Sequence, residues 1–485
     1  MPELSQRRRM LVLAICCMSL LIVGMDNTIV NVALKSLHVD LHASLSDLQW
    51  TIDAYTLVLA SLLMLSGSTA DRVGRRRSFQ TGLAIFTLGS LLCSLAPGLG
   101  WLVAFRMVQA VGGSMLNPVA MSIITNVFTD AKERAFAIGV WGGVVGISIG
   151  LGPIVGGALI DSVGWRGIFW INIPIGIAAI VLAALFVPES KAVRPRRPDI
   201  LGQSFVIVML ATLTYAIIEA PKRGWVSAPT LGLIAVAIVA AVALVAYENR
   251  RVDPLISPKF FRSVPFAGAT ITAVAGFGAY SGMLFINTLY LQNVRGYSAL
   301  EAGVCTLPLA LGTLVLAPIS GRIVGSRGAR VPLLVAGLGF MAAGFVLVAI
   351  SPHSPLIQLL LGYVIFSVGF GMLNPPITNS AVSGMPRHQA GVAAAVASTS
   401  RQVGATLGVA IVGSVINSGS GAVQSGTAFT DASRPAWWIV VGCGAAIAVL
   451  GIVTTGRWAR RTAERAAEQF EEDAPAPAAV AAGSA

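Results

Sequence analysis

MLVLAICCMSLLIVGMDNTIVNVAL, residues Met10–Leu34, is the first long apolar stretch of the chain. At a helical rise of about 1.5 Å per residue it would cross a hydrocarbon core of roughly 30 Å. It contains one carboxylate, Asp26, with the polar Asn27 and Asn31 close by. A charged group at this depth costs about 2.5–3.5 kcal/mol or more to insert. We therefore expect Asp26 to be protonated, paired or open to a watery cavity, and to take up and release a proton or cation.

Apolar residues dominate the rest of the chain as well. Of its 485 residues, 55% are hydrophobic and only 11% are charged. A soluble domain typically carries about 25% charged residues. The composition therefore predicts an all-α polytopic membrane protein. The five cysteines all fall within apolar stretches, and we interpret them as small core residues.

Fourteen segments have the length and hydropathy of membrane-spanning helices. An even number of crossings places both termini on one side of the membrane. The predicted spans are approximately 10–34, 48–70, 78–97, 100–126, 135–160, 166–187, 199–219, 229–247, 265–290, 300–321, 331–350, 355–380, 389–416 and 435–456.

The basic residues indicate which side faces the cytoplasm. The termini and the loops on their side hold 25 of the 33 Lys and Arg residues, and the opposite loops hold six. Because loops rich in Lys and Arg stay in the cytoplasm, we expect both termini there, in the inner (plasma) membrane of a bacterium. The same asymmetry accounts for the net charge of +12 without a nucleic-acid partner.

The two halves of the chain repeat one motif. Residues 112–118 read GGSMLNP and residues 369–375 read GFGMLNP, and the loop at 67–77 has a weaker echo at 321–330. Parallel repeats of this kind place a substrate cavity between two bundles, near the middle of the membrane. The predicted division is an N-terminal six-helix bundle (1–190), two inserted helices with cytoplasmic linkers (191–264), a C-terminal six-helix bundle (265–456) and a partly disordered cytoplasmic tail (457–485).

Three charged residues fall at one depth of the first bundle. At helical rise, Asp26, Asp53 and Arg106 lie within about 8–12 Å of the expected outer boundary. Two acids and an arginine this close together are candidates for proton coupling, because neighbouring charges change one another's titration. Two alternatives remain open: a static ion-pair network that orients the helices, and an Asp53 that lipid headgroups solvate.

Polar residues in other spans are candidates for lining a substrate cavity. Span ten has no carboxylate, and Arg401 is the one deep charge of the second half. For each of the candidates listed below, the alternative is a role in helix packing alone. The four histidines lie in or near loops, and no metal site is expected. The cavity candidates are Asn31, Gln109, Asn117, Tyr280, Asn287, Tyr290, Gln292, Asn374 and Arg401.

The loop after span two, residues 67–77, reads GSTADRVGRRR. Its glycines allow a tight turn, and its acid and arginines can pair with each other or with helix ends of the facing bundle. Such bonds would close the cytoplasmic side. The positive-inside rule explains the arginines, but it does not explain an acid between two glycines. The candidates for this gate are Gly67, Asp71, Arg72, Gly74, Arg75 and Arg76.

Span five contains GISIGLGPIVGG at residues 146–157. Glycines three and four residues apart make a smooth helix face that another helix can approach closely. The proline removes one backbone hydrogen bond and is expected to kink the helix. The residues of this motif are Gly146, Gly150, Gly152, Pro153, Gly156 and Gly157.

Together these motifs resemble those of the major facilitator superfamily. The 67–77 loop is similar to the signature between helices two and three, 102–114 to the helix-four motif, and 146–159 to the helix-five motif typical of antiporters. Residues 25–34 and 165–176 resemble marks of the fourteen-helix drug:proton antiporter branch. The chain departs from the family pattern at Ala110 and Lys35, where Gly and Pro are usual. The absence of an acid in span ten argues against export of divalent cations.

The resemblance implies a proton-coupled antiporter that works by alternating access as a monomer and exports hydrophobic, cationic drugs. The proton gradient would be its energy source, with no cofactor. Asp26, Asp53 and Arg106 would couple protons to transport. The main alternative is a dedicated exporter of one metabolite, such as an antibiotic, lipid or siderophore. Proton-linked uptake and a membrane sensor or scaffold are more remote, and no HExxH or GxSxG motif of an enzyme is present.

Overall fold

The computed structural model describes residues 5–191, 199–251, 254–383, 385, 390–420 and 426–472, and these form helices and connections without a strand. The disorder expected at the very end of the tail concerns residues outside this part. The longer helices are α1 (Gln6–Val32), α3 (Leu45–Val73), α4 (Arg75–Ser94), α5 (Leu99–Val127), α6 (Ala131–Val163), α8 (Asn172–Phe186), α9 (Ile200–Arg223), α10 (Ala228–Glu248), α11 (Val264–Leu289), α13 (Leu307–Arg327), α14 (Arg330–Val348), α15 (Leu356–Val382), α16 (Ala390–Ser420), α17 (Thr427–Val453) and α18 (Arg457–Glu472).

Short helices complete the path of the chain. α2 (Leu34–Asp40) follows α1, α7 (Gly167–Trp170) leads into α8, and α12 (Ala299–Cys305) leads into α13. A 3-10 turn, η1 (Pro258–Arg262), precedes α11, and a π-helical turn, η2 (Tyr290–Val294), follows it.

Twelve helical segments in the described part are long and apolar enough to cross a membrane. They coincide with twelve of the fourteen predicted spans. The remaining two predicted spans, 78–97 and 389–416, correspond to α4 and α16, which are helical but are not among the twelve. α4 opens with three arginines and carries several Ser and Thr, which lowers its mean hydropathy. The chain is therefore a multi-pass helical membrane protein.

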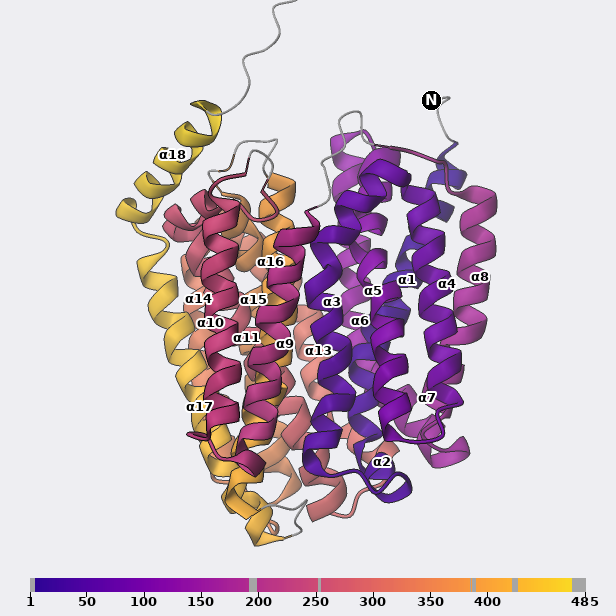
Figure 1. Cartoon of the computed structure of the whole chain (residues 1–485), viewed down its shortest axis with the longest axis vertical. Helices are drawn as coiled ribbons and strands as arrows, with labels where there is room; N and C mark the ends of the chain where they lie inside the picture. Colours follow the sequence, from indigo (N-terminus) through magenta and orange to yellow (C-terminus); the bar gives the residue numbers. More distant parts are fainter. Residues whose placement is uncertain are drawn as a thin grey trace, which may run out of the picture.

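The helices pack as two groups, and α9 lies at the boundary between them (Figure 1). In the N-terminal half, α5 packs on α3 and α4, and α1 packs on α6. In the C-terminal half, α11 packs on α16, and α14 packs on α15 and α17. Of the inserted pair, α9 contacts α3 of one half and α16 of the other, whereas α10 packs mainly on α9.

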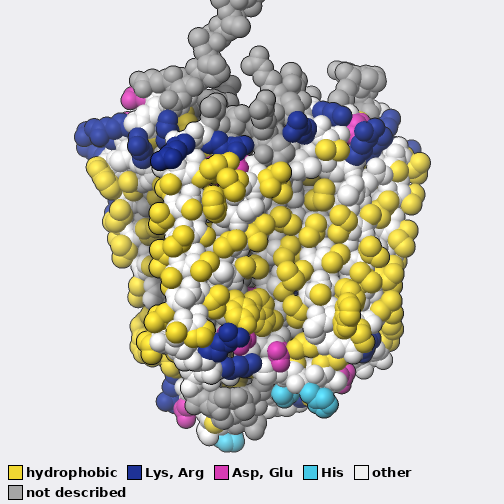
Figure 2. Space-filling model, in the orientation of Figure 1, with side chains coloured by type: hydrophobic (Ala, Val, Ile, Leu, Met, Phe, Trp, Pro, Cys, Tyr) yellow, Lys and Arg dark blue, Asp and Glu magenta, His cyan; other side chains and the backbone are white. Residues whose placement is uncertain are grey.

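The surface has an apolar belt between two polar ends. Figure 2 shows hydrophobic side chains over the middle of the visible face and a band of Lys and Arg along one end. Large apolar side chains on the outer helices are exposed, with Leu185 of α8 at 63% and Val239 of α10 at 66%. The start of α1 and helix α18 lie at the basic end, and α2 and α7 lie at the opposite end (Figure 1). We name these the α18 end and the α2 end.

Candidate functional site

Asp26 of α1 lies at the centre of a buried polar network in the N-terminal half. Its side chain is 0% exposed, and its Oδ2 forms an ion pair with Nη1 of Arg106 from α5, which is 1% exposed. Asp26 Oδ1 accepts hydrogen bonds from Gln109 Nε2 (2.8 Å) and Asn172 Nδ2 (3.1 Å). The carboxylate therefore has donors on both oxygens, which a buried charge requires.

Ser90 of α4 closes this network. Its hydroxyl oxygen accepts hydrogen bonds from Gln109 Nε2 at 2.7 Å and from Asn172 Nδ2 at 3.1 Å, and Arg106 Nη1 donates to Gln109 Oε1 at 2.9 Å. We call these five residues the Asp26 network: Asp26, Ser90, Arg106, Gln109 and Asn172. Four helices contribute to it (α1, α4, α5 and α8), so a change in the charge of Asp26 acts on hydrogen bonds that join all four.

Aromatic rings cover the arginine of the network. The guanidinium carbon of Arg106 lies 4.1 Å from the centroid of the Tyr55 ring and 5.9 Å from that of Phe169. Arg106 Nε donates to the backbone oxygen of Thr51 at 3.4 Å. Cation–π contact and burial keep this charge away from water, so its interaction with Asp26 is weakly screened.

The network contains residues that sequence reasoning did not select. Ser90 and Asn172 were not named as site residues, although Asn172 lies in the quoted 165–176 motif. Tyr55 was also missed. An amide inside an otherwise apolar segment was the available signal for Asn172, whereas a serine in a helix carries none.

Asp53 lies outside the Asp26 network. It is 0% exposed, and neither carboxylate oxygen has a hydrogen-bond partner in the described structure. Thr51 and Tyr55, which contact Arg106, are each two residues away, and two residues turn a helix by about 200°. Asp53 therefore occupies the opposite face of α3, and the predicted cluster of two acids and one arginine does not form here.

That opposite face of α3 packs against α16 of the C-terminal half. One turn before Asp53, Gln49 Nε2 donates to the backbone oxygens of Val409 (3.2 Å) and Ala410 (3.0 Å). One turn after it, Thr56 and Thr406 share a hydrogen bond of 2.8 Å. Asp53 is thus an unpartnered carboxylate at the contact between the two halves.

The candidate gate loop bonds within its own half. Asp71 pairs with Arg75 at 2.9 Å rather than with Arg72, which is exposed. The backbone N–H of Arg76 donates to Glu189 Oε1 at 3.1 Å. Gly74 has a φ of +129°, a conformation that favours glycine. The loop is therefore attached to the connection between α8 and α9, and Gly67 lies within α3 against Pro118.

The glycines of α6 face two different neighbours. Gly152 and Gly156 face α1, where an added Cβ at Gly152 would meet the backbone oxygen of Met25 at 3.1 Å. Gly150 and Gly157 face the other half, and a Cβ on Gly157 would lie 2.5 Å from the backbone oxygen of Ala299 in α12. Gly146 also faces that half at α13, and Pro153 sits inside α6 between these contacts. α6 therefore joins the two halves through backbone-to-backbone approach.

Hydrogen bonds also join the halves at the α2 end. Asp161 of α6 accepts from the backbone N–H groups of Ala299 (3.3 Å) and Leu300 (3.1 Å) at the start of α12. Lys35 Nζ donates to the backbone oxygen of Gln292 at 2.9 Å, and Gln292 Nε2 donates to that of Val32 at 2.9 Å. We call this set the α2-end seal. The predicted cavity residue Gln292 belongs to this seal.

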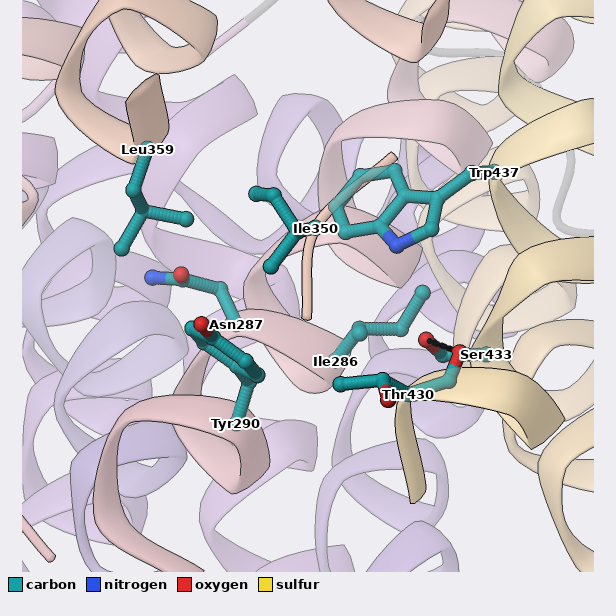
Figure 3. A pocket seen from close by; sticks show the side chains of 8 residues that line it. All are labelled: Ile286, Asn287, Tyr290, Ile350, Leu359, Thr430, Ser433 and Trp437. Carbon is teal, nitrogen blue, oxygen red and sulfur yellow. Dashed lines mark hydrogen bonds between the residues drawn. The ribbon is translucent and has the colours of Figure 1, made fainter. Parts of the chain in front are cut away.

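The other cavity candidates separate into distinct places. Asn287 and Tyr290 line a small pocket inside the C-terminal half with Ile350, Leu359 and Trp437 (Figure 3). Its volume of about 10 Å³ fits one water molecule, far below the roughly 300 Å³ of a small-molecule site. Asn31 donates to backbone oxygens of its own helix, and Gln109 belongs to the Asp26 network. The amide oxygen of Asn117 has no hydrogen-bond partner among the residues that the structure describes.

Three cavity candidates of the C-terminal half lie close to one another. Arg401 Nη2 donates to Thr378 Oγ1 at 2.6 Å, and Thr378 Oγ1 donates to the backbone oxygen of Asn374 at 3.4 Å. The ring of Tyr280 stacks on Phe370, one turn before Asn374, at 4.2 Å between centroids. Tyr280, Asn374 and Arg401 therefore converge from α11, α15 and α16.

Two packed half-bundles, one of which encloses a buried ion pair, make up a multi-pass membrane protein. The chain belongs to the Major Facilitator Superfamily, whose family model matches residues 16–409. The chain is thus a member of a transporter family, and that membership gives no support to an enzymatic activity.

Named relatives cover most of the chain. It is 36% identical over 410 residues to the multidrug resistance protein Stp of Mycobacterium tuberculosis, covering 84% of this chain and 76% of that protein. It is 36% identical over 404 residues to the tetracenomycin C resistance and export protein of Streptomyces glaucescens, with coverages of 83% and 75%. It is 32% identical over 409 residues to the multidrug efflux pump LfrA of Mycolicibacterium smegmatis, with coverages of 84% and 81%.

Solved structures share the fold. A structure from a study of proton-dependent oligopeptide transporters aligns with a TM-score of 0.62 at 15% identity, covering 94% of this chain and 100% of that one. A bacterial homologue of the human lysosomal transporter Spinster aligns with a TM-score of 0.61 at 19% identity, with coverages of 98% and 100%. At these identities the likeness concerns the fold alone.

Proposed function

We propose that this protein exports hydrophobic small molecules, drugs among them, in exchange for protons. The observation that carries the proposal is the Asp26 network: a carboxylate buried in a membrane bundle and held by donors from other helices. An ionisable residue inside a membrane protein is most often part of an ion or proton pathway. The named relatives, which are drug resistance and efflux proteins, support the direction of transport.

The topology we propose has fourteen crossings with both termini in the cytoplasm. α4 has 20 residues, about 30 Å at helical rise, and packs on α5 and α8; α16 packs on α11 and α3. Counted with the twelve apolar spans, these two helices give the number typical of the fourteen-helix drug:proton antiporter branch. The band of Lys and Arg at the α18 end supports a cytoplasmic location for that end.

Under this orientation the structure is closed on the outer side, where the α2-end seal joins the halves. A proton that reaches Asp26 from outside removes the charge that holds Arg106, and the network must then rearrange. Asp53, which lies where α3 meets α16, is a second proton carrier that both halves contact. Protons that enter the cell supply about 2.3 kcal/mol per charge per 100 mV. Alternating access then proceeds by rocking of the halves about the glycine contacts of α6, in a monomer.

Inverted vesicles with an acidic interior test this proposal. Lipophilic compounds, cationic ones included, are added outside, and the interior pH is followed for the native chain, Asp26→Asn and the control Asp431→Asn, whose carboxylate is 62% exposed. Native vesicles and the control should lose interior protons when a substrate is added, and Asp26→Asn should not. Proton release that persists in Asp26→Asn would move the coupling role to Asp53.

A second candidate is a dedicated exporter of one metabolite. One of the relatives is named for the export of a single antibiotic, tetracenomycin C. The Asp26 network and the fold would be the same for both functions. A response to one compound class and to no other in the vesicle panel would favour this candidate.

A further inference from the structure

Arg401 of α16 is a half-buried cation without a counterion among the described residues. Its Nη2 donates to Thr378, and its guanidinium carbon lies 5.9 Å from the centroid of the Phe277 ring. Its Nε is buried and has no hydrogen-bond partner, and no carboxylate of the described residues lies within ion-pair distance. The other deep arginine, Arg106, is paired with Asp26. A buried N–H donor that is left without a partner costs free energy, so the unpaired Nε of this half-buried charge calls for an explanation.

Aromatic side chains surround Arg401, together with further polar atoms that lack hydrogen-bond partners among the described residues. Phe370 contacts both Phe277 (5.2 Å between centroids) and Tyr280 (4.2 Å). Within the described part of the chain, neither the hydroxyl of Tyr280, a residue 6% exposed, nor the amide oxygen of Asn374 has a hydrogen-bond partner. We call this set the Arg401 cluster: Phe277, Tyr280, Phe370, Asn374, Thr378 and Arg401. Its unsatisfied groups come from three helices of the C-terminal half.

We propose that the Arg401 cluster binds an acidic group, a carboxylate or an ionised enol, on an aromatic or apolar compound that the protein exports. A guanidinium offers several N–H donors in a fixed plane, which suits a carboxylate better than a neutral group. The Tyr280 hydroxyl supplies one more donor, and the rings of Phe277 and Phe370 supply apolar contact. The proposal rests on the proposed export function and adds a substrate class that Asp26 and Asp53, both acids, are poorly suited to hold.

The membrane potential favours the export of such compounds. When an anion leaves a negatively charged cytoplasm, its electrical free energy falls by about 2.3 kcal/mol per charge per 100 mV. Among the described residues, no ion pair joins Asp53 and Arg401. The competing explanation is that Arg401 pairs with an acid of this chain, such as Asp53, in another conformation.

Matched compounds separate these explanations. The probes are one lipophilic aromatic carboxylic acid, its methyl ester and the amine of the same skeleton. Binding to the purified full-length protein and export from cells are measured for the native chain, Arg401→Gln and Arg401→Lys. The control is Arg322→Gln, an exposed arginine of α13 at the α18 end. Arg401→Gln should weaken binding of the acid by about 10- to 100-fold, the usual loss for a hydrogen-bonded charge, and leave the ester and the amine unchanged.

Arg401→Lys should give an intermediate loss for the acid, because lysine keeps the charge but not the planar fork. An equal loss for acid, ester and amine would overturn the proposal and favour a pairing role within the chain. Unchanged binding of the acid in Arg401→Gln would overturn it outright. The binding measurement does not depend on export, so a native chain that binds the acid but exports nothing would count against the proposed function alone.

Discussion

A double-mutant cycle on Asp26 and Arg106 tests whether the ion pair acts as one unit. Both side chains are almost completely buried. Asp26→Asn leaves the guanidinium without its counterion, and breaking a buried pair from one side costs about 3–5 kcal/mol. Arg106→Gln should lower the free energy of unfolding by less, about 3 kcal/mol, because Gln109 and Asn172 still donate hydrogen bonds to the carboxylate of Asp26. In the double variant no charge remains, so we expect a loss of about 1–2 kcal/mol, that of an imperfect neutral hydrogen bond.

The assay is reversible unfolding in detergent micelles at neutral pH, with the free energy of unfolding taken from the denaturant midpoint. The control is the exposed pair Asp431 and Arg434, at 3.2 Å, for which we expect at most about 1 kcal/mol. A loss in the double variant equal to the sum of the two single losses, within about 0.5 kcal/mol, would refute the reasoning. The two residues would then be independent, and protonation of Asp26 would not act through Arg106.

Two glycine substitutions test the turn between α3 and α4 and the contact between α6 and α12. Gly74→Ala should destabilise the protein by roughly 1–3 kcal/mol, because its φ is +129° and a Cβ would lie 2.7 Å from Glu189 Oε1. Gly164→Ala, with φ +85° and nothing within 4 Å, is the matched control, and an equal loss there would exclude the Glu189 contact as the cause. Gly157→Ala should open the α2-end seal, because its Cβ would overlap backbone of α12 that cannot rotate away. Labelling of a cysteine introduced into the seal should rise several-fold, whereas Gly142→Ala, with open space around it, should leave labelling unchanged; no difference between the two would contradict this reading.

Much of the fold could be predicted from the sequence because each membrane-spanning segment must meet the requirements of insertion within its own short stretch of chain. A helix must satisfy its own backbone in lipid, so apolar length alone predicts a crossing. All fourteen predicted segments are helical, and twelve pass as apolar spans. α4 and α16 are harder to assign, because helices that face other helices can carry arginines, serines and threonines without contact with lipid.

The candidate site was predictable in part. A lone acid and a lone arginine in apolar spans are conspicuous, and Asp26 and Arg106 do form an ion pair. Asn172 and Ser90 come from segments far away in the chain, so only the packing of α4 and α8 against α1 and α5 brings them to the carboxylate.

The sequence by itself determined which segments are helices, which end carries most of the positive charges and which three charged residues lie deep in the first half. It did so because each of these properties depends on a short stretch and the solvent around it. Only the tertiary structure decided the partners. Asp53 lies on the face of α3 turned away from Arg106. Arg401 lies near the ring of Phe277, and no carboxylate in the described part of the chain pairs with it. Depth in a membrane follows from position along the chain, whereas the direction of a side chain follows from how helices rotate against one another, and packing alone fixes that rotation.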